Sequence, residues 1–310
     1  MTDLLRPPAV PNDAVVAIVS PASTPQPERV ERGLEALRSL GYAPQAAGHV
    51  LTRGPLYFAG TPEMRLRDLH HAFADDEVRA IFSTRGGYGS HYLLDGLDLD
   101  LIAESAKPFI GYSDLTALQM WLLDQLQLPA FHGPMLSADF AREDGIHLPS
   151  LHAALSGQTY TVAADEGLRT LHPGRARGTL YGGCLSILVS LLGTPFEPQT
   201  EGKLLFLEDT GAKPYQIDRM LWQLRQAAKL DGVRGIVFGE MLDCASPGAP
   251  LELLEEVILR VFDDFSGPIA IGLRSGHVSR GNVTLTLGVE AELATADEAR
   301  LRLLEPAVIP

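Results

Sequence analysis

The stretch from Phe109 to Leu118, "FIGYSDLTAL", predicts a strand, a turn and a helix in immediate succession. Residues 108–110 are short and apolar, like the end of a buried strand. Leucines then recur downstream at helical spacing, at Leu115, Leu118 and Leu122. Ser113 falls at the junction, where a serine commonly caps the free N–H groups of a helix. The stretch alone leaves two interpretations of Ser113 open: a helix cap, or a nucleophile on a strand-to-helix turn.

The first half of the chain repeats this alternation of short apolar strands and amphipathic helices. Strand patterns occur at 14–20 and 78–84, and helix patterns occur at 30–40 and 61–76. Such alternation predicts a largely parallel sheet flanked by helices, in which ligands bind at the carboxyl ends of the strands.

The periodicity weakens between Ala141 and Arg177 and resumes with a good strand at 202–209. We therefore predict two α/β domains, at 1–145 and 178–310, joined by a linker at 146–177. Near the end, residues 282–293 alternate in the manner of one half-exposed strand.

The composition excludes several classes of protein. The 310 residues include 25 basic and 39 acidic side chains, and the net charge of −14 argues against nucleic acid or an anionic membrane as a partner. Two cysteines without paired spacing argue against a disulfide framework or a thiolate zinc site. Prolines interrupt the N-terminus where a signal peptide needs a continuous apolar core, so we expect a cytoplasmic protein.

Three further stretches could carry chemistry. The turn "STRGGYGS" at 83–90 presents backbone N–H groups without side-chain obstruction, and it fits neither a dinucleotide fingerprint nor a P-loop. Glu208 ends a predicted strand, and His277 lies in a glycine-flanked loop. His132 either lines the crevice at the carboxyl ends of the strands or is a structural histidine. A serine, a carboxylate and a histidine are the parts of a serine hydrolase, but "GYSD" lacks the second glycine of the α/β-hydrolase elbow.

Taken together, the motifs resemble those of the LD-carboxypeptidase family of serine peptidases, whose relatives include the microcin-immunity peptidases. The matching stretches run in the family's order from Ile18 to Gly288: "VSPAS", "YFAGTPEMRLRDLHHAFADDEVRAIFSTRGGYG", "FIGYSDLTAL", "FHGPM", "GTLYGGCLSILVSLLGTP", "LFLEDTGAKPYQIDRMLWQL" and "SGHV…VTLTLG". The chain departs from the family pattern at Cys184, where an asparagine is expected, and at Ala212, where an acidic residue is frequent.

The resemblance implies a role for each site residue. Ser113 would be the nucleophile, His277 the general base and Glu208 the acid that orients the histidine, in a site between the two domains. The backbone N–H groups of Gly87 and Asp114 would form the oxyanion hole. No metal or cofactor is implied, and members of the family are often homodimers.

An enzyme of this kind must also recognise the free carboxylate of its substrate. Arginine binds carboxylates through two parallel hydrogen bonds. Arg85, Arg274 and Arg280 lie in or beside the motif loops and are the candidates.

The expected reaction is hydrolysis of the L,D peptide bond before a terminal D-amino acid, as in release of D-alanine from a muropeptide tetrapeptide during peptidoglycan recycling. An alternative is a microcin-immunity-like peptidase acting on aminoacyl or peptidyl nucleotides, which would need an aromatic or basic surface. Trp121 and Trp222 both fall in predicted helices and are interpreted as core residues, which disfavours that alternative. A third possibility, from a class other than enzymes, is a non-catalytic protein that binds a small molecule.

Overall fold

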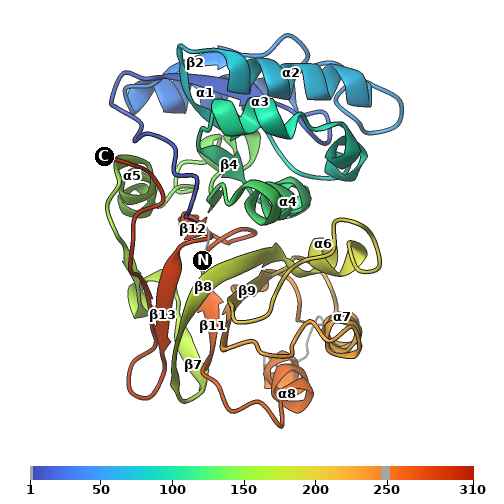
Figure 1. Cartoon of the computed structure of the whole chain (residues 1–310), viewed down its shortest axis with the longest axis vertical. Helices are drawn as coiled ribbons and strands as arrows, with labels where there is room; N and C mark the ends of the chain where they lie inside the picture. Colours follow the sequence, from blue (N-terminus) through green and yellow to red (C-terminus); the bar gives the residue numbers. More distant parts are fainter. Residues whose placement is uncertain (1–2, 246–251) are drawn as a thin grey trace.

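The computed structural model describes residues 3–245 and 252–310, and each half of the chain is built around its own β-sheet. In Figure 1 the blue-to-green half lies above the yellow-to-red half. The expected two-part α/β architecture is confirmed.

The N-terminal sheet has the strand order β12-β5-β4-β3-β1-β2. Neighbouring strands are parallel except for β12, which runs antiparallel to β5. The strands are β1 (Val15–Val19), β2 (Ala43–Ala46), β3 (Val78–Ser83), β4 (Phe109–Gly111), β5 (Ala130–His132) and β12 (Leu285–Leu287). The prediction of a largely parallel first sheet is therefore confirmed.

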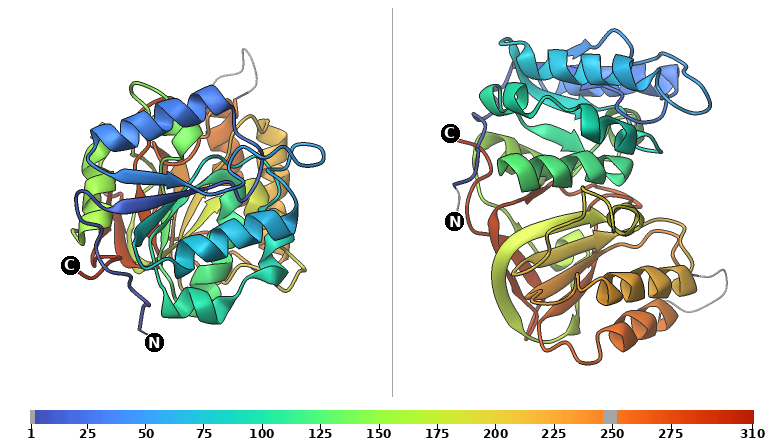
Figure 2. Two further views of the ribbon diagram at one scale, coloured as in Figure 1. Left: turned by 90° about the horizontal axis from the view of Figure 1, so that it is seen from above. Right: turned by 45° about the vertical axis from the view of Figure 1, so that its right-hand side comes forward.

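Helices cover both faces of this sheet, as the view from above in Figure 2 shows for α1 and α2. Alternate residues of β1 explain why: Val16 and Ile18 pack in one apolar cluster with α1, whereas Ala17 and Val19 pack in another with α2. The helices of this half are α1 (Pro27–Ser39), α2 (Pro62–Ala74), α3 (Leu99–Glu104), α4 (Thr116–Leu126) and α5 (Leu148–Ser156). Short helical turns are η1 (Ser90–Gly96), η2 (Ser113–Leu115) and η3 (Leu136–Phe140).

The C-terminal sheet has the order β6-β14-β13-β8-β9-β10-β11-β7. Its four central strands, β8 to β11, are parallel, and the outer strands are antiparallel to their neighbours. The strands are β6 (Thr161–Val162), β7 (Arg169–His172), β8 (Arg175–Cys184), β9 (Leu204–Glu208), β10 (Gly235–Gly239), β11 (Ile269–Leu273), β13 (Glu290–Ala294) and β14 (Arg300–Leu303). The helices are α6 (Leu185–Ser190), α7 (Pro214–Gln226) and α8 (Glu252–Val261), with a turn η4 (Ala164–Glu166).

The segment 146–177, which the sequence predicts as a linker, contains regular structure. It holds α5 and two strands, β6 and β7, which are the outermost strands of the C-terminal sheet. The domain boundaries at 145 and 178 stay a prediction.

The prediction of one half-exposed strand over 282–293 is wrong. The chain turns at Gly288, whose φ of +95° suits glycine, and divides the segment into β12 and β13. β12 joins the N-terminal sheet and β13 joins the C-terminal sheet, so both strands are largely buried. One strand from late in the chain, β12, therefore completes the N-terminal sheet and links the two halves.

Within the described residues, none of the helices is both long enough and apolar enough to span a bilayer.

Candidate active site

Ser113 lies on a tight turn between β4 and α4. β4 ends at Gly111, η2 begins at Ser113 and α4 follows at Thr116, as the sequence predicts. The backbone of Ser113 is left-handed, with φ of +65°, a conformation that costs roughly 1–3 kcal/mol in a residue other than glycine. Among the described residues, no side chain caps the N-terminus of η2 or of α4. The strained turn is the backbone geometry of a nucleophile elbow rather than of a capped helix.

The glycine turn after β3 packs directly against Ser113. A Cβ atom on Gly86 would lie 2.7 Å from Cβ of Ser113 and 3.1 Å from the backbone nitrogen of Asp114, so only glycine fits there. Gly87 follows with φ of +99°. The two backbone N–H groups expected to bind an oxyanion, those of Gly87 and Asp114, therefore belong to segments that touch.

Side chains hold these two segments together. The Ser90 backbone N–H donates to Asp114 Oδ2 at 2.8 Å, and the Ser90 hydroxyl donates to the Asp114 carbonyl at 2.6 Å. On the other side of the turn, the Tyr88 N–H donates to Ser23 Oγ at 3.1 Å. Asp114 and Ser90 are fully buried, so the two bonds between them are shielded from water.

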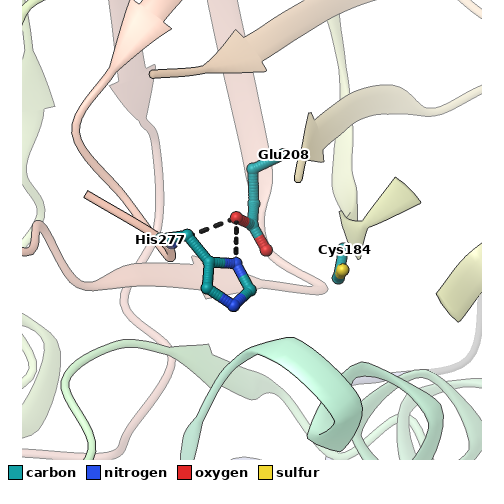
Figure 3. A group of neighbouring side chains, drawn as sticks. All are labelled: Cys184, Glu208 and His277. Carbon is teal, nitrogen blue, oxygen red and sulfur yellow. Dashed lines mark hydrogen bonds and ion pairs between the residues drawn. The ribbon is translucent and has the colours of Figure 1, made fainter. Parts of the chain in front are cut away.

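Glu208 and His277 form a directly bonded pair. Glu208 is the last residue of β9 and is fully buried, and His277 lies in the loop after β11. His277 Nδ1 is 2.8 Å from Glu208 Oε2, and the His277 backbone N–H donates to the same oxygen at 3.0 Å (Figure 3). This arrangement fixes the ring and leaves Nε2 free of the carboxylate, as a general base requires.

Glu208 and His277 each change the pKa of the other. Burial alone would lower the pKa of His277, but the charge of Glu208 and the hydrogen bond to it outweigh burial and raise that pKa. Burial alone would raise the pKa of Glu208, but the charge of His277 and their hydrogen bonds lower it. Both shifts favour an ionised carboxylate beside a protonated imidazolium.

The side chain of Asn282 stabilises the loop that carries His277. Asn282 accepts from the Gly276 N–H at 3.0 Å and donates to the Gly276 carbonyl at 3.1 Å. A Cβ on Gly276 would lie 2.6 Å from the Glu208 carboxyl carbon and 2.8 Å from His132 Nε2. His132 is fully buried, and burial lowers its pKa to about 4, so it is neutral at physiological pH. It is not part of the lining of the open cavity that His277 lines.

Two of the contacts between the serine half and the histidine half lie next to Ser113 in the sequence. The rings of Tyr112 and His277 have centroids 5.1 Å apart. The backbone N–H of Cys184, at the end of β8, donates to Thr116 Oγ1 at 3.1 Å. Ser113 lies between Tyr112 and Thr116 in the sequence, so both contacts bring the C-terminal sheet to the serine turn.

A cavity of about 420 Å³ opens beside His277. Its lining includes Arg85, one of the three predicted arginines, and two arginines that sequence reasoning missed, Arg29 and Arg142. Arg274 instead donates to the Asp165 carbonyl, and the exposed Arg280 does not line this cavity. Nothing in the sequence marks Arg29 or Arg142, because only folding brings α1 and the segment after η3 to His277.

The two departures from the family pattern have different surroundings. Cys184 is the register partner of Glu208 in the neighbouring parallel strand and is buried beside it (Figure 3). Ala212 is partly buried against the core.

The interpretation of both tryptophans as core residues is half wrong. Trp121 is partly buried against Phe196, but Trp222 is 49% exposed on α7. Helical periodicity does not locate a residue of intermediate polarity at the margin of an apolar face.

A histidine bonded to a buried carboxylate, and a serine on a strained strand-to-helix turn whose preceding tyrosine contacts that histidine, are features of the class of serine hydrolases. Comparison with known proteins specifies the family. Residues 16–133 match the LD-carboxypeptidase N-terminal domain, and residues 177–293 match the LD-carboxypeptidase C-terminal domain. The chain belongs to the LD-carboxypeptidase family, and the prediction of a serine-type LD-carboxypeptidase is confirmed.

Individual relatives agree with this assignment. The chain is 38% identical to the probable murein peptide carboxypeptidase of Bacillus subtilis strain 168, over 94% of this chain and 92% of that protein. The crystal structure of muramoyltetrapeptide carboxypeptidase from Oxalobacter formigenes has a TM-score of 0.84 and 28% identity, covering 96% of this chain and 100% of the other. The microcin C7 self-immunity protein of Escherichia coli is 29% identical over 87% of each chain.

Proposed function

We propose that this protein removes the terminal D-alanine from a muropeptide tetrapeptide by hydrolysing the L,D peptide bond, in the cytoplasmic recycling of peptidoglycan. The observation that carries the proposal is the bonded pair of His277 and Glu208, whose histidine contacts the residue before Ser113 and lines an arginine-containing cavity. The names of the relatives from Bacillus and Oxalobacter support the choice of substrate.

In the proposed mechanism, His277 accepts the proton of Ser113 as the serine oxygen attacks the scissile carbonyl. The N–H groups of Gly87 and Asp114 donate to the resulting oxyanion, and each such donor contributes roughly a hundred- to a thousandfold in turnover. His277 then gives its proton to the departing amine of D-alanine. Water deprotonated by His277 hydrolyses the acyl-enzyme and regenerates Ser113.

The cavity suits an anionic peptide. Its three arginines lie near His277 on a chain whose net charge is −14, so they form a locally basic site in an acidic protein. A tetrapeptide with a free terminal carboxylate and further acidic groups would bind there. We assign the terminal carboxylate to Arg85, because that residue lies within the glycine turn and lines the cavity.

The proposal includes a homodimer, as the resemblance implies. It predicts that size-exclusion chromatography with light scattering gives twice the chain mass. A monomeric mass at assay concentration would contradict this part alone.

The test of function is release of D-alanine from L-Ala-γ-D-Glu-diaminopimelate-D-Ala by the purified protein, with Ser113→Ala beside it. The wild type should release D-alanine, and the variant should lose roughly four to six orders of magnitude in turnover. Release by both proteins would mean that Ser113 is not the nucleophile. Release by neither would overturn the proposed substrate.

A second candidate substrate is an aminoacyl or peptidyl nucleotide, with the same three catalytic residues. The observation that favours it is a cluster of exposed aromatic rings beside the glycine turn, formed by Tyr57, Tyr88 and Tyr92. Such rings can stack on a base. Cleavage of an aminoacyl-nucleotide conjugate by a protein that leaves the tetrapeptide intact would establish this alternative.

A further inference from the structure

The strongest unexplained feature of the site is Cys184, because the mechanism uses neither its thiol nor the second oxygen of Glu208. Cys184 ends β8 and Glu208 ends β9, and the two residues are direct partners in the parallel register. Residues paired in this way point to the same face of a sheet. The thiol is therefore placed beside the carboxylate by the sheet itself.

Three different donor atoms converge there. Sγ of Cys184, a carboxylate oxygen of Glu208 and a ring nitrogen of His277 all lie within 4.8 Å of one another. Donor atoms around a tetrahedral Zn²⁺ ion are roughly 3.5 Å apart, so small side-chain rotations would close the site. A set of one sulfur, one nitrogen and one oxygen suits thiophilic ions and does not suit Mg²⁺ or Ca²⁺, which prefer oxygen alone.

An unpartnered buried oxygen points to a cationic ligand. Glu208 Oε1 has no hydrogen-bond donor among the described residues, although Glu208 is fully buried. Figure 3 shows this oxygen on the side of Cys184, while Oε2 faces His277. Leaving a buried carboxylate oxygen without a partner is costly, and a bound cation would supply one.

A further carboxylate adjoins the three donor atoms, and one of the donors faces a cavity. Asp209 Oδ2 lies 3.9 Å from Sγ of Cys184, so a second buried carboxylate adjoins the cluster. His277 lines the open cavity of about 420 Å³, so an ion would approach from its side; Cys184 and Glu208 are buried and do not line the cavity.

We propose that Cys184, Glu208 and His277 bind a thiophilic divalent cation, Zn²⁺ or Cd²⁺, and that the bound ion inhibits the enzyme. On binding, the thiol releases its proton to solvent as the sulfur–metal bond forms, and a ring nitrogen of His277 gives its lone pair to the ion. No oxidant or reductant is needed. If the ion takes the lone pair that would accept the proton of Ser113, His277 can no longer act as the base. If the ion instead displaces the hydrogen bond between His277 and Glu208, the ring is no longer held in position to accept that proton. This inhibition rests on the proposed function, whereas the binding does not.

The binding test uses Cd²⁺, whose bond to a thiolate gives a charge-transfer absorption in the ultraviolet. The chain has only two cysteines, so Cys244→Ser is the matched control for Cys184→Ser. The wild type and Cys244→Ser should gain the absorption at one ion per chain, and Cys184→Ser should not. Absorption in Cys184→Ser, or none in the wild type, would overturn the proposal.

A second variant covers the case in which Cys184→Ser does not fold. His277→Ala keeps the thiol, and its apparent affinity for Cd²⁺ should fall at least tenfold; an unchanged affinity would remove His277 from the site. In the activity arm, Zn²⁺ should inhibit the wild type reversibly, with EDTA restoring the rate. The inhibitory concentration should rise at least tenfold in Cys184→Ser, measured against that variant's own uninhibited rate. Cd²⁺ absorption without tetrapeptide hydrolysis would uphold the binding site and reject the proposed function.

Discussion

The ring of Tyr112 meets the ring of His277 edge to face, with centroids 5.1 Å apart and planes at 87°. Tyr112 immediately precedes Ser113, and His277 is held by Glu208 in the other half of the chain. The aromatic contact therefore sets how the histidine faces the serine turn. The following predictions depend on that joint arrangement of the two halves.

Replacing Glu208 by glutamine should lower turnover roughly 10³- to 10⁴-fold and move the pH profile. In the wild type the raised pKa of His277 keeps the ring protonated to a higher pH than usual, so kcat/KM should rise with pH through a value above 6.5. A neutral amide no longer stabilises the imidazolium, so the acid limb of the Glu208→Gln profile should shift to lower pH. An unshifted limb in a pH series of kcat/KM would argue that His277 is not the titrating base.

Adding one methyl group at Gly86 should reduce turnover at least a hundredfold. The new Cβ would lie 2.7 Å from Cβ and 2.9 Å from Oγ of Ser113, which must move away from the oxyanion donors. Gly48→Ala is a matched control, because a Cβ there would meet nothing within 4 Å. Steady-state rates of the two variants, with thermal unfolding of both, would separate a site effect from a fold effect. Equal rates in the two variants would contradict the packing described here.

Arg85→Ala should raise KM for the tetrapeptide roughly tenfold or more while changing kcat less, because loss of a carboxylate contact weakens binding. Arg280→Ala is the comparison, since Arg280 is exposed and does not line the cavity. The geometry predicts the larger effect at Arg85. A larger rise in KM for Arg280→Ala would transfer the recognition of the carboxylate to the loop after His277.

Asp124→Asn should change the pH dependence of stability. Burial raises the pKa of Asp124 to about 6 from 3.8, although Tyr181 donates a hydrogen bond to it at 2.8 Å. The folded protein thus binds a proton more tightly than the unfolded chain, and Asp124 lowers the free energy of unfolding as the pH rises from about 4 to above 6. Relative to the wild type, the variant should gain on the order of 1–3 kcal/mol over that range. Urea unfolding at several pH values measures the difference, and a constant difference would show that Asp124 does not titrate in this way.

Much of the site could be predicted because its residues lie where local patterns change. A strand pattern ends before Ser113 and a helix pattern begins after it, and Glu208 ends a run of apolar residues. The carboxyl ends of parallel strands gather at one edge, so these positions indicate a common crevice.

What could not be predicted depends on strand register and on contacts between distant segments. No local pattern shows that Cys184 is the partner of Glu208, since the register follows from how β8 and β9 align. The alternation over 282–293 is the same whether it forms one strand or two. Only the sheets on either side show that the chain turns at Gly288.

The pairing of β12 with β5 has a consequence for synthesis of the protein. β5 ends at His132, yet its partner strand begins at Leu285. While the ribosome makes the roughly 150 residues between them, the nascent N-terminal sheet has β5 as an exposed edge, open to pairing with other chains. The strand that closes this edge follows His277 by only a few residues. Closure of the sheet and arrival of the histidine therefore coincide, so a prematurely terminated chain would be both inactive and prone to aggregation.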